Sequence, residues 1–331
     1  MPPLFSIPSS MNNPSPVTIE LIRAAHERIR PFIHRTPVLT SGRVNAIASA
    51  QLFFKCENFQ KVGAFKARGA HNAILGLSDE EAARGVVTHS SGNHAGAVAL
   101  AARARGAHAT IIMPSNAPRI KKAAVLEYGG KIIECEPTVP ARESTTAAFM
   151  AQTGAVLIHP YDDDRIVAGQ GTAAVEFIEQ VPDLDYLLTP VGGGGLLSGS
   201  AIAARALDPR IKVVGTEPAL ADDAWRSFKS GQHVLLKSTT TIADGLRISL
   251  GERNFAYIRA NVHDIVTVTE DGIIAAMRLV WESMKIIIEP SCAVPLAALL
   301  ENQVPAAAGR RVGIILTGGN VDLDSLPWMK K

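Results

Sequence analysis

A lysine among small and apolar neighbours is the first feature of this chain that indicates chemistry. Lys66 lies in the stretch 63–70, where glycine and alanine predominate and Phe65 precedes it. Burial without a partner favours the neutral amine, a nucleophile that forms a Schiff base with a carbonyl compound. A lysine beside a phenylalanine can also lay its stem on an apolar surface and keep its ammonium in water. The octapeptide alone leaves both interpretations open.

Four consecutive glycines, Gly192, Gly193, Gly194 and Gly195, are the second such feature. Glycine loses more backbone entropy on folding than any other residue, so this run predicts a place where something approaches the backbone closely. Successive N–H groups before a helix form a pocket for an anion such as phosphate. The run lacks the Lys-Ser/Thr of a nucleoside-triphosphate loop and the spacing of a dinucleotide fingerprint. Tight packing of a strand against a helix remains the alternative role.

Two further polar loops are expected at the ends of strands. Residues 90–94, Ser-Ser-Gly-Asn-His, offer hydroxyl, amide and backbone donors suited to a carboxylate, although an ordinary polar turn that caps a helix has a similar composition. Residues 317–320, Thr-Gly-Gly-Asn, follow another apolar run. Because parallel strands end at one edge of a sheet, these loops, the glycine run and Lys66 are expected to meet in one site.

Carboxylates at Glu217 and Asp223, with Asp222 and the carbonyls between them, supply oxygen ligands of the kind that a hard divalent cation prefers. Two carboxylates in a loop are more often simply solvated. The spacing alone therefore does not decide between a metal site and a solvated loop.

The elements that must position these residues alternate between strand and helix. The spacing of Ile19, Ile22, Ala25 and Ile29 predicts a first helix that begins after Ser15 and ends before Pro31. A strand over 52–55 is expected before Lys66, which would start the next helix. Further strands are predicted over 85–89, 109–113, 131–134, 156–159, 186–191, 212–216, 264–268 and 312–316, and further helices over 95–105, 120–128, 142–153, 166–181, 196–206 and 270–285.

This alternation predicts an α/β protein with two doubly wound, mainly parallel sheets. A length of 331 residues suggests roughly two domains, and 47% hydrophobic against 19% charged residues indicates a compact globule. A net charge of +2 gives no field that would attract nucleic acid or a membrane surface. The three cysteines show no disulfide or zinc spacing, so a cytoplasmic protein with a small-molecule ligand is expected.

Taken together, and in this order along the chain, the stretches 58–70, 90–94, 192–195 and 317–320 resemble those of the fold-type II pyridoxal-phosphate enzymes, whose type example is the tryptophan synthase β chain. Within them the chain is similar to the serine/threonine dehydratases. The resemblance implies a large cofactor-binding domain over 17–80 and 162–331 and a small mobile domain over 81–161. The composition of residues 1–16, rich in proline, serine and asparagine, predicts a loose tail.

The resemblance also implies roles for single residues. Lys66, beside Phe65, would carry the cofactor as a Schiff base, Asn93 would contact its 3′-oxygen, the glycines 192–195 its phosphate, and Thr317 its ring nitrogen. The substrate carboxylate would be bound by a set of polar residues, namely Ser90, Ser91, Asn93 and His94.

Two details narrow the subgroup to the serine racemases and 3-hydroxyaspartate dehydratases. Ser91 stands where many threonine dehydratases have alanine, and the resemblance makes it the base on the cofactor face opposite Lys66. The segment 217–223 resembles that subgroup's metal site, with Glu217, the Ala221 carbonyl and Asp223 as ligands for Mg²⁺, Ca²⁺ or Mn²⁺. Ile248 departs from the pattern, because serine racemases tend to have a serine there, which argues against strong racemisation.

The function expected from the resemblance is elimination of water from serine, threonine or 3-hydroxyaspartate, with serine racemisation as a second activity or as the main one. For 3-hydroxyaspartate, Arg142 is the candidate for binding the second carboxylate. A homodimer and an ATP effector are also implied. A nicotinamide-dependent oxidoreductase and a non-catalytic phosphate-binding protein are the alternatives of other classes.

Overall fold

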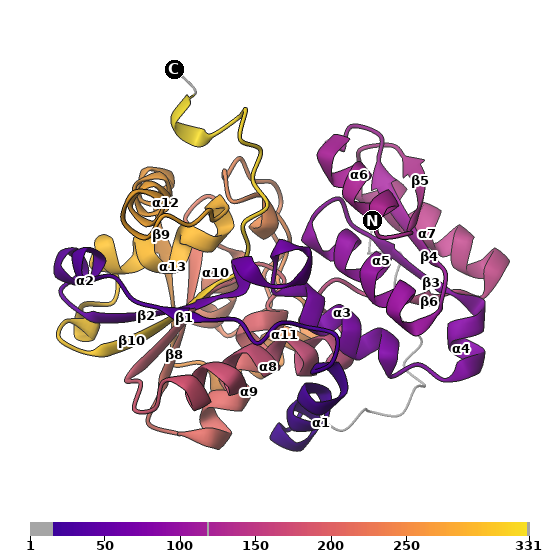
Figure 1. Cartoon of the computed structure of the whole chain (residues 1–331). Coiled ribbons are helices and arrows are strands. Elements are labelled where there is room, and N and C mark those ends of the chain that lie inside the picture. Colours follow the sequence, from indigo (N-terminus) through magenta and orange to yellow (C-terminus); the bar gives the residue numbers. More distant parts are fainter. Residues whose placement is uncertain (1–15, 118, 330–331) are drawn as a thin grey trace.

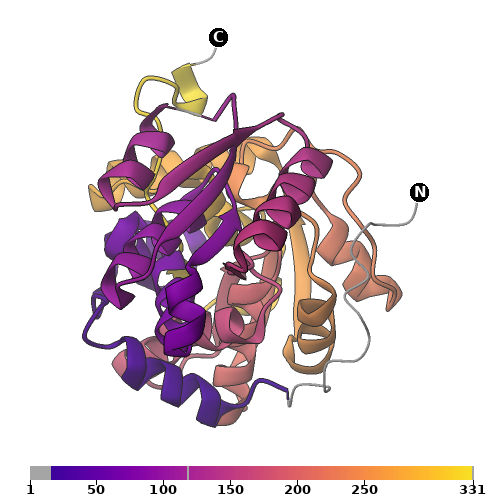
Figure 2. The same ribbon diagram turned by 90° about the vertical axis from the view of Figure 1, so that its right-hand side faces the viewer.

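The computed structural model describes residues 16–117 and 119–329, which form two mainly parallel sheets, each covered by helices (Figure 1). Seen after a turn of 90°, the smaller sheet lies in front of the larger one (Figure 2). None of the helices within these residues is both long and apolar enough to cross a membrane.

The larger sheet has six strands in the order β1-β2-β10-β7-β8-β9. Strand β1 pairs antiparallel with β2, and the other neighbours are parallel. The strands are β1 (Val38–Leu39), β2 (Gln51–Cys56), β7 (Tyr186–Pro190), β8 (Lys212–Pro218), β9 (Asp264–Val268) and β10 (Arg311–Leu316). Strand β7 lies in the interior of this sheet, so the glycine run that follows it emerges near the middle of the sheet's edge.

The smaller sheet has four parallel strands in the order β5-β4-β3-β6. They are β3 (Val86–His89), β4 (Ala109–Pro114), β5 (Lys131–Cys135) and β6 (Val156–Leu157). All four lie within 81–161, whereas every strand of the larger sheet lies outside that range. This division agrees with the expected small domain, whose boundaries stay a prediction.

The helices cover both faces of the larger sheet because side chains alternate along its strands. Leu188 faces a core formed with α2 (Gly42–Ala48), α12 (Glu270–Met284) and α13 (Pro290–Leu300), and Leu187 faces the opposite core. The remaining helices are α1 (Ile19–Ile29), α3 (Lys66–Leu75), α4 (Asp79–Arg84), α5 (Asn93–Arg105), α6 (Arg119–Glu127), α7 (Val139–Thr153), α8 (Asp164–Gln180), α9 (Gly195–Leu207), α10 (Asp223–Ser230) and α11 (Glu252–Asn261).

The predicted fold class is confirmed, and the predicted strands and helices are present with bounds that differ by a few residues. The first helix begins at Ile19 after Thr18, so Pro16 is not its first residue, and Ser15 lies outside the described residues. Five helices were not predicted: α2, α4, α10, α11 and α13. The longest of these, α13, is buried around its whole circumference from Pro290 to Leu299 and therefore has no amphipathic pattern.

Candidate active site

The predicted site residues converge where strands of the two sheets end. Lys66 follows β2, the glycine run follows β7, and Thr317 follows β10 of the larger sheet; Ser90 follows β3 of the smaller one. The backbone links two of these loops directly, because Phe65 N donates to Thr317 O at 3.0 Å. The expectation of one site at the carboxyl edges of the strands agrees with this arrangement.

Lys66 is the first residue of α3, and a backbone carbonyl accepts a hydrogen bond from its amine. Its Nζ donates to the Pro160 carbonyl at 2.8 Å and lies 5.1 Å from the centre of the Phe65 ring. Burial lowers the pKa of Lys66 to about 8, although the nearby Glu289 carboxylate acts in the opposite direction. A substantial fraction of this amine is therefore neutral near pH 7.5, as a nucleophile or general base requires.

The glycine run forms a close-fitting cradle at the N-terminus of α9. Gly194 has φ +90°, a left-handed conformation that favours glycine, and a Cβ on Gly193 would lie 2.1 Å from Cγ of Tyr161. Asn254 Nδ2 fixes the loop by donating to the Gly193 carbonyl at 2.7 Å. The first N–H groups of α9 have no acceptors within the helix, so the cradle suits a phosphate.

The loop 90–94 places its polar groups at the N-terminus of α5. Ser90, Ser91 and Asn93 are partly exposed, whereas His94 is buried and its Nε2 donates to the Ile158 carbonyl at 3.1 Å. Burial lowers the pKa of His94 well below its usual value, so the ring is neutral and its Nδ1 has no donor among the described residues. A carboxylate at this place would meet the first backbone N–H groups of α5 rather than the His94 ring.

Asn93 is oriented by a glutamate that the sequence analysis did not identify. Asn93 Nδ2 donates to Glu289 Oε1 at 2.9 Å, and Asn93 Oδ1 accepts from Asn320 Nδ2 at 2.9 Å. Burial raises the pKa of Glu289 to about 7. In the sequence, Glu289 lies in an apolar stretch for which no helix was predicted, so no local signal connects it with Lys66.

The segment between β6 and α8 was likewise missed, and it forms a wall of the site. Its Pro160 carbonyl holds Lys66, and the Tyr161 ring lies against Gly193 and meets the His159 ring edge-on at 4.7 Å between centroids. Asp162 accepts from the Arg253 N–H, which anchors the segment to α11. In the sequence this stretch reads as a polar loop before a helix, with no motif that predicts its position.

Arg142 lies on α7 of the smaller sheet, close enough to influence residues of the site. Burial lowers the pKa of His89, and the positive charge of Arg142 lowers it further. Burial raises the pKa of Tyr161 to about 12, and the charge of Arg142 opposes this rise. Among the described residues its guanidinium has no carboxylate partner and no hydrogen-bond acceptor. Arg142 thus presents a cation with no acceptor among these residues, on a helix that packs against β3, the strand before the loop 90–94.

The expected metal ligands form a buried acidic pair next to α10. Glu217 accepts from the Ala224 and Trp225 N–H groups at 3.1 and 2.8 Å, and Asp223 Oδ2 accepts from the Leu250 N–H at 2.8 Å. Asp223 Oδ1 is buried with no partner among the described residues. Burial raises the pKa of Asp223 to about 6, and burial together with Asp223 raises the pKa of Glu217 well above its usual value.

The donor set of this pair suits a hard cation, because a divalent ion would supply the missing counter-charge for two buried carboxylates. No cluster of three His, Cys, Asp or Glu side chains that could hold a metal occurs within residues 16–117 and 119–329. Glu217 and Asp223 would therefore need backbone oxygens, such as the Ala221 carbonyl, to complete a coordination sphere.

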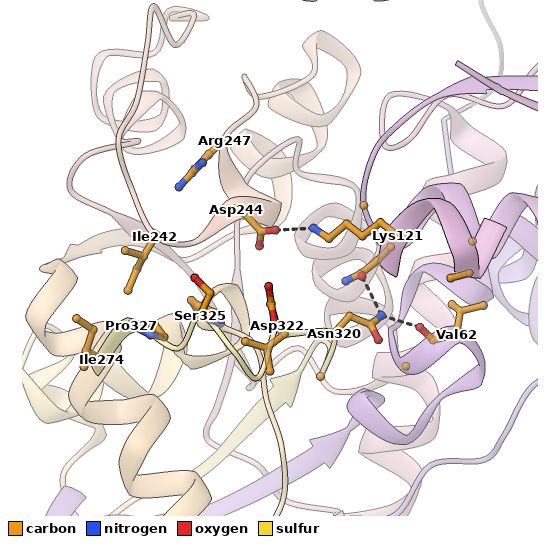
Figure 3. A pocket seen from close by; sticks show the side chains of 18 of the residues that line it. Val62, Lys121, Ile242, Asp244, Arg247, Ile274, Asn320, Asp322, Ser325 and Pro327 are labelled. Atoms are coloured by element: carbon orange, nitrogen blue, oxygen red, sulfur yellow. Dashed lines mark hydrogen bonds and ion pairs between the residues drawn. The ribbon is translucent and has the colours of Figure 1, made fainter. Parts of the chain in front are cut away.

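An open cavity of about 550 Å³ adjoins the site between the two sheets (Figure 3). Asn93 and Lys121 line it from the smaller-sheet side, and Asn320, Asp244 and Arg247 from the larger-sheet side. An ion pair of 2.8 Å between Lys121 Nζ and Asp244 Oδ2 crosses the cavity (Figure 3). A small molecule can therefore enter where the two sheets face each other.

Comparison with known proteins identifies the family of enzymes that has this arrangement. Residues 29–318 match the family model described as pyridoxal-phosphate dependent enzyme. The chain belongs to this family. It is 51% identical to the β-hydroxyaspartate dehydratase of Paracoccus denitrificans over 94% of this chain and 98% of that protein.

Two further relatives have similar sequence identities to this chain. The L-threo-3-hydroxyaspartate ammonia-lyase of Saccharomyces cerevisiae is 48% identical over 90% of this chain and 92% of that protein. The serine racemase of Dictyostelium discoideum, whose crystal structure is known, is 50% identical in sequence. The match covers 93% of this chain and 99% of that chain, and the two structures superpose with a TM-score of 0.89. The resemblance inferred from the motifs is confirmed, and a nicotinamide-dependent oxidoreductase has no support.

As a member of the pyridoxal-phosphate family, the chain is expected to hold that cofactor, and its residues fit the group. Lys66 offers an amine with a lowered pKa, and the glycine cradle offers backbone donors in a place where a side chain would not fit. Thr317 follows β10 and is almost fully buried, so its hydroxyl could meet a ring nitrogen in this set.

Proposed function

We propose that the chain catalyses the pyridoxal-phosphate-dependent elimination of water from a β-hydroxy amino acid. The unsaturated amine that is released then hydrolyses to a 2-keto acid and ammonia, taking up one water. The observation that carries this proposal is the partly buried Lys66 amine, with its pKa lowered to about 8, next to the glycine cradle of a family member.

The residues proposed to hold the cofactor are Phe65, Lys66, Asn93, Gly192, Gly193, Gly194, Gly195 and Thr317. When bound, pyridoxal phosphate withdraws the electrons that remain at the substrate Cα after proton removal. The chain's residues would hold that group at three places: its phosphate at the α9 N-terminus, its 3′-oxygen at Asn93, and its ring nitrogen at the Thr317 hydroxyl.

Proton transfer at the substrate Cα is assigned to Lys66. The Pro160 carbonyl holds its Nζ at 2.8 Å, and burial keeps a substantial part of the amine neutral, so it can accept the proton. Ser91, in the loop after β3, is proposed as the residue that delivers a proton from the opposite side. With Ser91 active the product would be the other enantiomer of the substrate; without it the β-hydroxyl would leave as water with the proton that Lys66 removed.

The substrate carboxylate is proposed to bind at the N-terminus of α5, where Ser90, Ser91, Asn93 and His94 lie. The helix presents free N–H groups there, and the helix dipole favours a negative charge. The His94 ring, which donates to the Ile158 carbonyl, orients this loop rather than contacting the carboxylate. For 3-hydroxyaspartate, Arg142 is proposed to bind the second carboxylate, because its guanidinium has no acceptor among the described residues.

Elimination rather than racemisation is proposed as the main outcome. Ile248 lies against the cradle, since a Cβ on Gly192 would be 3.3 Å from Ile248 Cγ1. An apolar side chain cannot relay a proton at this position. Ser91 favours serine racemisation as a second activity, and the ratio of D-serine to pyruvate formed from L-serine would measure it; D-serine in large excess over pyruvate would contradict our proposal.

Mg²⁺, Ca²⁺ or Mn²⁺ is proposed to bind Glu217, the Ala221 carbonyl and Asp223. The raised pKa values of the Glu217 and Asp223 carboxyl groups support this proposal, as does Asp223 Oδ1, which has no partner among the described residues. Addition of Mg²⁺ should raise the melting temperature of the protein but not of Asp223→Asn; equal shifts for both would refute the site. The homodimer, the ATP effector and a cytoplasmic location stay predictions from the resemblance.

The test of the main proposal is colour and turnover together. The purified protein should be yellow, its visible band should disappear with borohydride, and it should release ammonia from β-hydroxy amino acids. Lys66→Ala should abolish both the borohydride reaction and the ammonia release. Lys212→Ala removes an exposed lysine at the amino end of β8, away from the carboxyl edge at which the site lies. This variant should retain the borohydride reaction and the ammonia release. Ammonia release by Lys66→Ala at the wild-type rate would overturn the assignment.

A further inference from the structure

The hydroxyl of Tyr161 is a polar group at the site that the mechanism above leaves without a role. Its ring is fixed on two sides, by Gly193 of the cradle and by the His159 ring at 4.7 Å. The backbone is fixed as well, since the Tyr161 carbonyl accepts from Asn254 Nδ2 at 3.0 Å. Tyr161 also directly follows Pro160, whose carbonyl holds Lys66. The side chain therefore occupies a defined place between the lysine and the cradle.

The Tyr161 hydroxyl is a donor without an acceptor. None of the described residues makes a hydrogen bond to it, and the side chain is partly exposed. Burial, followed by the charges of Asp162, Asp223 and Glu143, raises the pKa of Tyr161 to about 12, so the hydroxyl keeps its proton at neutral pH. A phenol in such a place satisfies its O–H through a ligand or through water.

Arg142 is the cation that acts on this hydroxyl. It is among the groups that affect the pKa of Tyr161, and it opposes the burial and the acidic neighbours. Two of those acidic neighbours are engaged elsewhere: Asp162 accepts from the Arg253 N–H, and Asp223 belongs to the buried pair with Glu217. The geometry connects the two groups: α7, which carries Arg142, packs against β3, β3 ends at His89, and the His89 and His159 rings meet edge-on at 6.0 Å, next to Tyr161. A phenol O–H and a guanidinium, each without an acceptor among the described residues, thus border the same side of the site, as the recognition of a carboxylate requires.

We infer that the Tyr161 hydroxyl, together with Arg142, binds the second carboxylate of a dicarboxylic substrate and so determines specificity for 3-hydroxyaspartate over serine. This inference rests on the proposed function for the identity of the substrate class. It adds a specificity-determining residue from the segment between β6 and α8, at a position for which the sequence offered no motif.

The test separates carboxylate binding from elimination. L-Aspartate and L-alanine carry no β-hydroxyl, and only aspartate has a second carboxylate, so their dissociation constants can be measured from the change in the visible band of the holoenzyme. Tyr161→Phe keeps the ring against Gly193 and His159 and removes only the hydroxyl. It should weaken aspartate binding roughly 10- to 100-fold, as expected for a hydrogen bond to a charged group, and leave alanine within about 3-fold.

A matched control is Tyr257→Phe. Tyr257 donates to Asp164 at 3.0 Å and accepts from the Val17 N–H, so it supports the start of α8 away from the cradle. Its loss should leave the ratio of aspartate to alanine affinity unchanged. In an Arg142→Ala background, Tyr161→Phe should have a smaller effect on aspartate than in the wild type, because both groups bind the same carboxylate.

Three outcomes would overturn the inference: equal losses for aspartate and alanine in Tyr161→Phe, no loss for aspartate, or a wild type that binds both amino acids equally. A failure of the proposed function looks different. The wild type would then release no ammonia from serine, threonine or 3-hydroxyaspartate, while the ratio of aspartate to alanine affinity would still decide the role of Tyr161. With turnover present, kcat/KM for L-threo-3-hydroxyaspartate should fall in Tyr161→Phe and that for L-serine should not.

Discussion

At the scale of single residues, the reactivity of Lys66 depends on two opposing influences. Burial lowers the pKa of the amine, and the Glu289 carboxylate raises it, with a result of about 8. Glu289 also holds the Asn93 amide, so one buried carboxyl group acts on two residues of the site. Its own pKa is about 7, which makes it mostly ionised at the pH where Lys66 titrates.

Glu289→Gln should therefore lower the pKa of the Lys66 amine in the apoenzyme below 8. The glutamine can still accept from Asn93, so the geometry is kept while the charge is lost. The measurement is the rate at which the visible band forms after addition of pyridoxal phosphate, followed against pH; the midpoint of this profile should move to lower pH. Glu282→Gln, an exposed glutamate on α12, serves as the control. A midpoint that stays or rises would contradict the predicted influence of Glu289.

At the scale of elements, a buried charge cluster joins the strand and helix on either side of the lysine loop to α8. Glu176 of α8 accepts from Lys55 of β2 at 2.7 Å and from Arg68 of α3 at 2.9 Å, and Arg68 also pairs with Glu57 at 2.7 Å. All four side chains are almost completely buried. Since α3 begins at Lys66, the cluster fixes the helix that carries the reactive amine.

Glu176→Gln should lower the free energy of unfolding by about 3–5 kcal/mol, because it leaves Lys55 and Arg68 buried without their shared counter-charge. Burial alone would raise the pKa of Glu176, but Arg68 and Lys55 outweigh burial and hold it at about 2. The stabilisation is thus present above pH 4.5 and is lost as the pH falls toward 2.

Urea unfolding of wild type and variant at neutral pH and at about pH 3 would measure both effects, and the difference between them should shrink at the lower pH. Glu179→Gln, three residues later on the same helix, removes an exposed glutamate that pairs with exposed Arg35 at 3.5 Å. It should change the free energy of unfolding by less than about 0.5 kcal/mol. Equal losses in both variants would refute the role of burial.

The elements also explain how far the sequence predicts the site. Lys66, the glycine run and the loops 90–94 and 317–320 were found because each carries its chemistry within a few adjacent residues and follows a recognisable strand. Glu289 and Tyr161 were not found, because their importance arises from contacts with residues that are distant in the sequence. Glu289 contacts Asn93, which is 196 positions away, and Tyr161 contacts Gly193, which is 32 positions away. Helix α13 was missed because a fully buried helix has no periodic pattern.

At the scale of the whole molecule, the two sheets face each other across the cavity beside the site, and polar contacts join its sides. Lys121 of α6 pairs with Asp244 (Figure 3), and Asn93 of α5 accepts from Asn320. Both contacts run from a helix packed on the smaller sheet to a loop at the edge of the larger one. These contacts therefore help to set the distance between the two sides of the cavity, between which a substrate would bind.

The Lys121–Asp244 pair should make substrate binding sensitive to salt. Both side chains are partly exposed, so the pair contributes at most about 1 kcal/mol and is screened at high ionic strength. In the wild type, KM for the amino-acid substrate should rise up to about 5-fold between low and high salt, and Lys121→Gln should have the raised KM at low salt with a weaker dependence. The neighbouring Lys122 of α6 pairs with Glu134 of β5, which is on its own side of the cavity, so Lys122→Gln should behave as the wild type. An identical salt dependence in all three proteins would show that the cross-cavity pair does not influence binding.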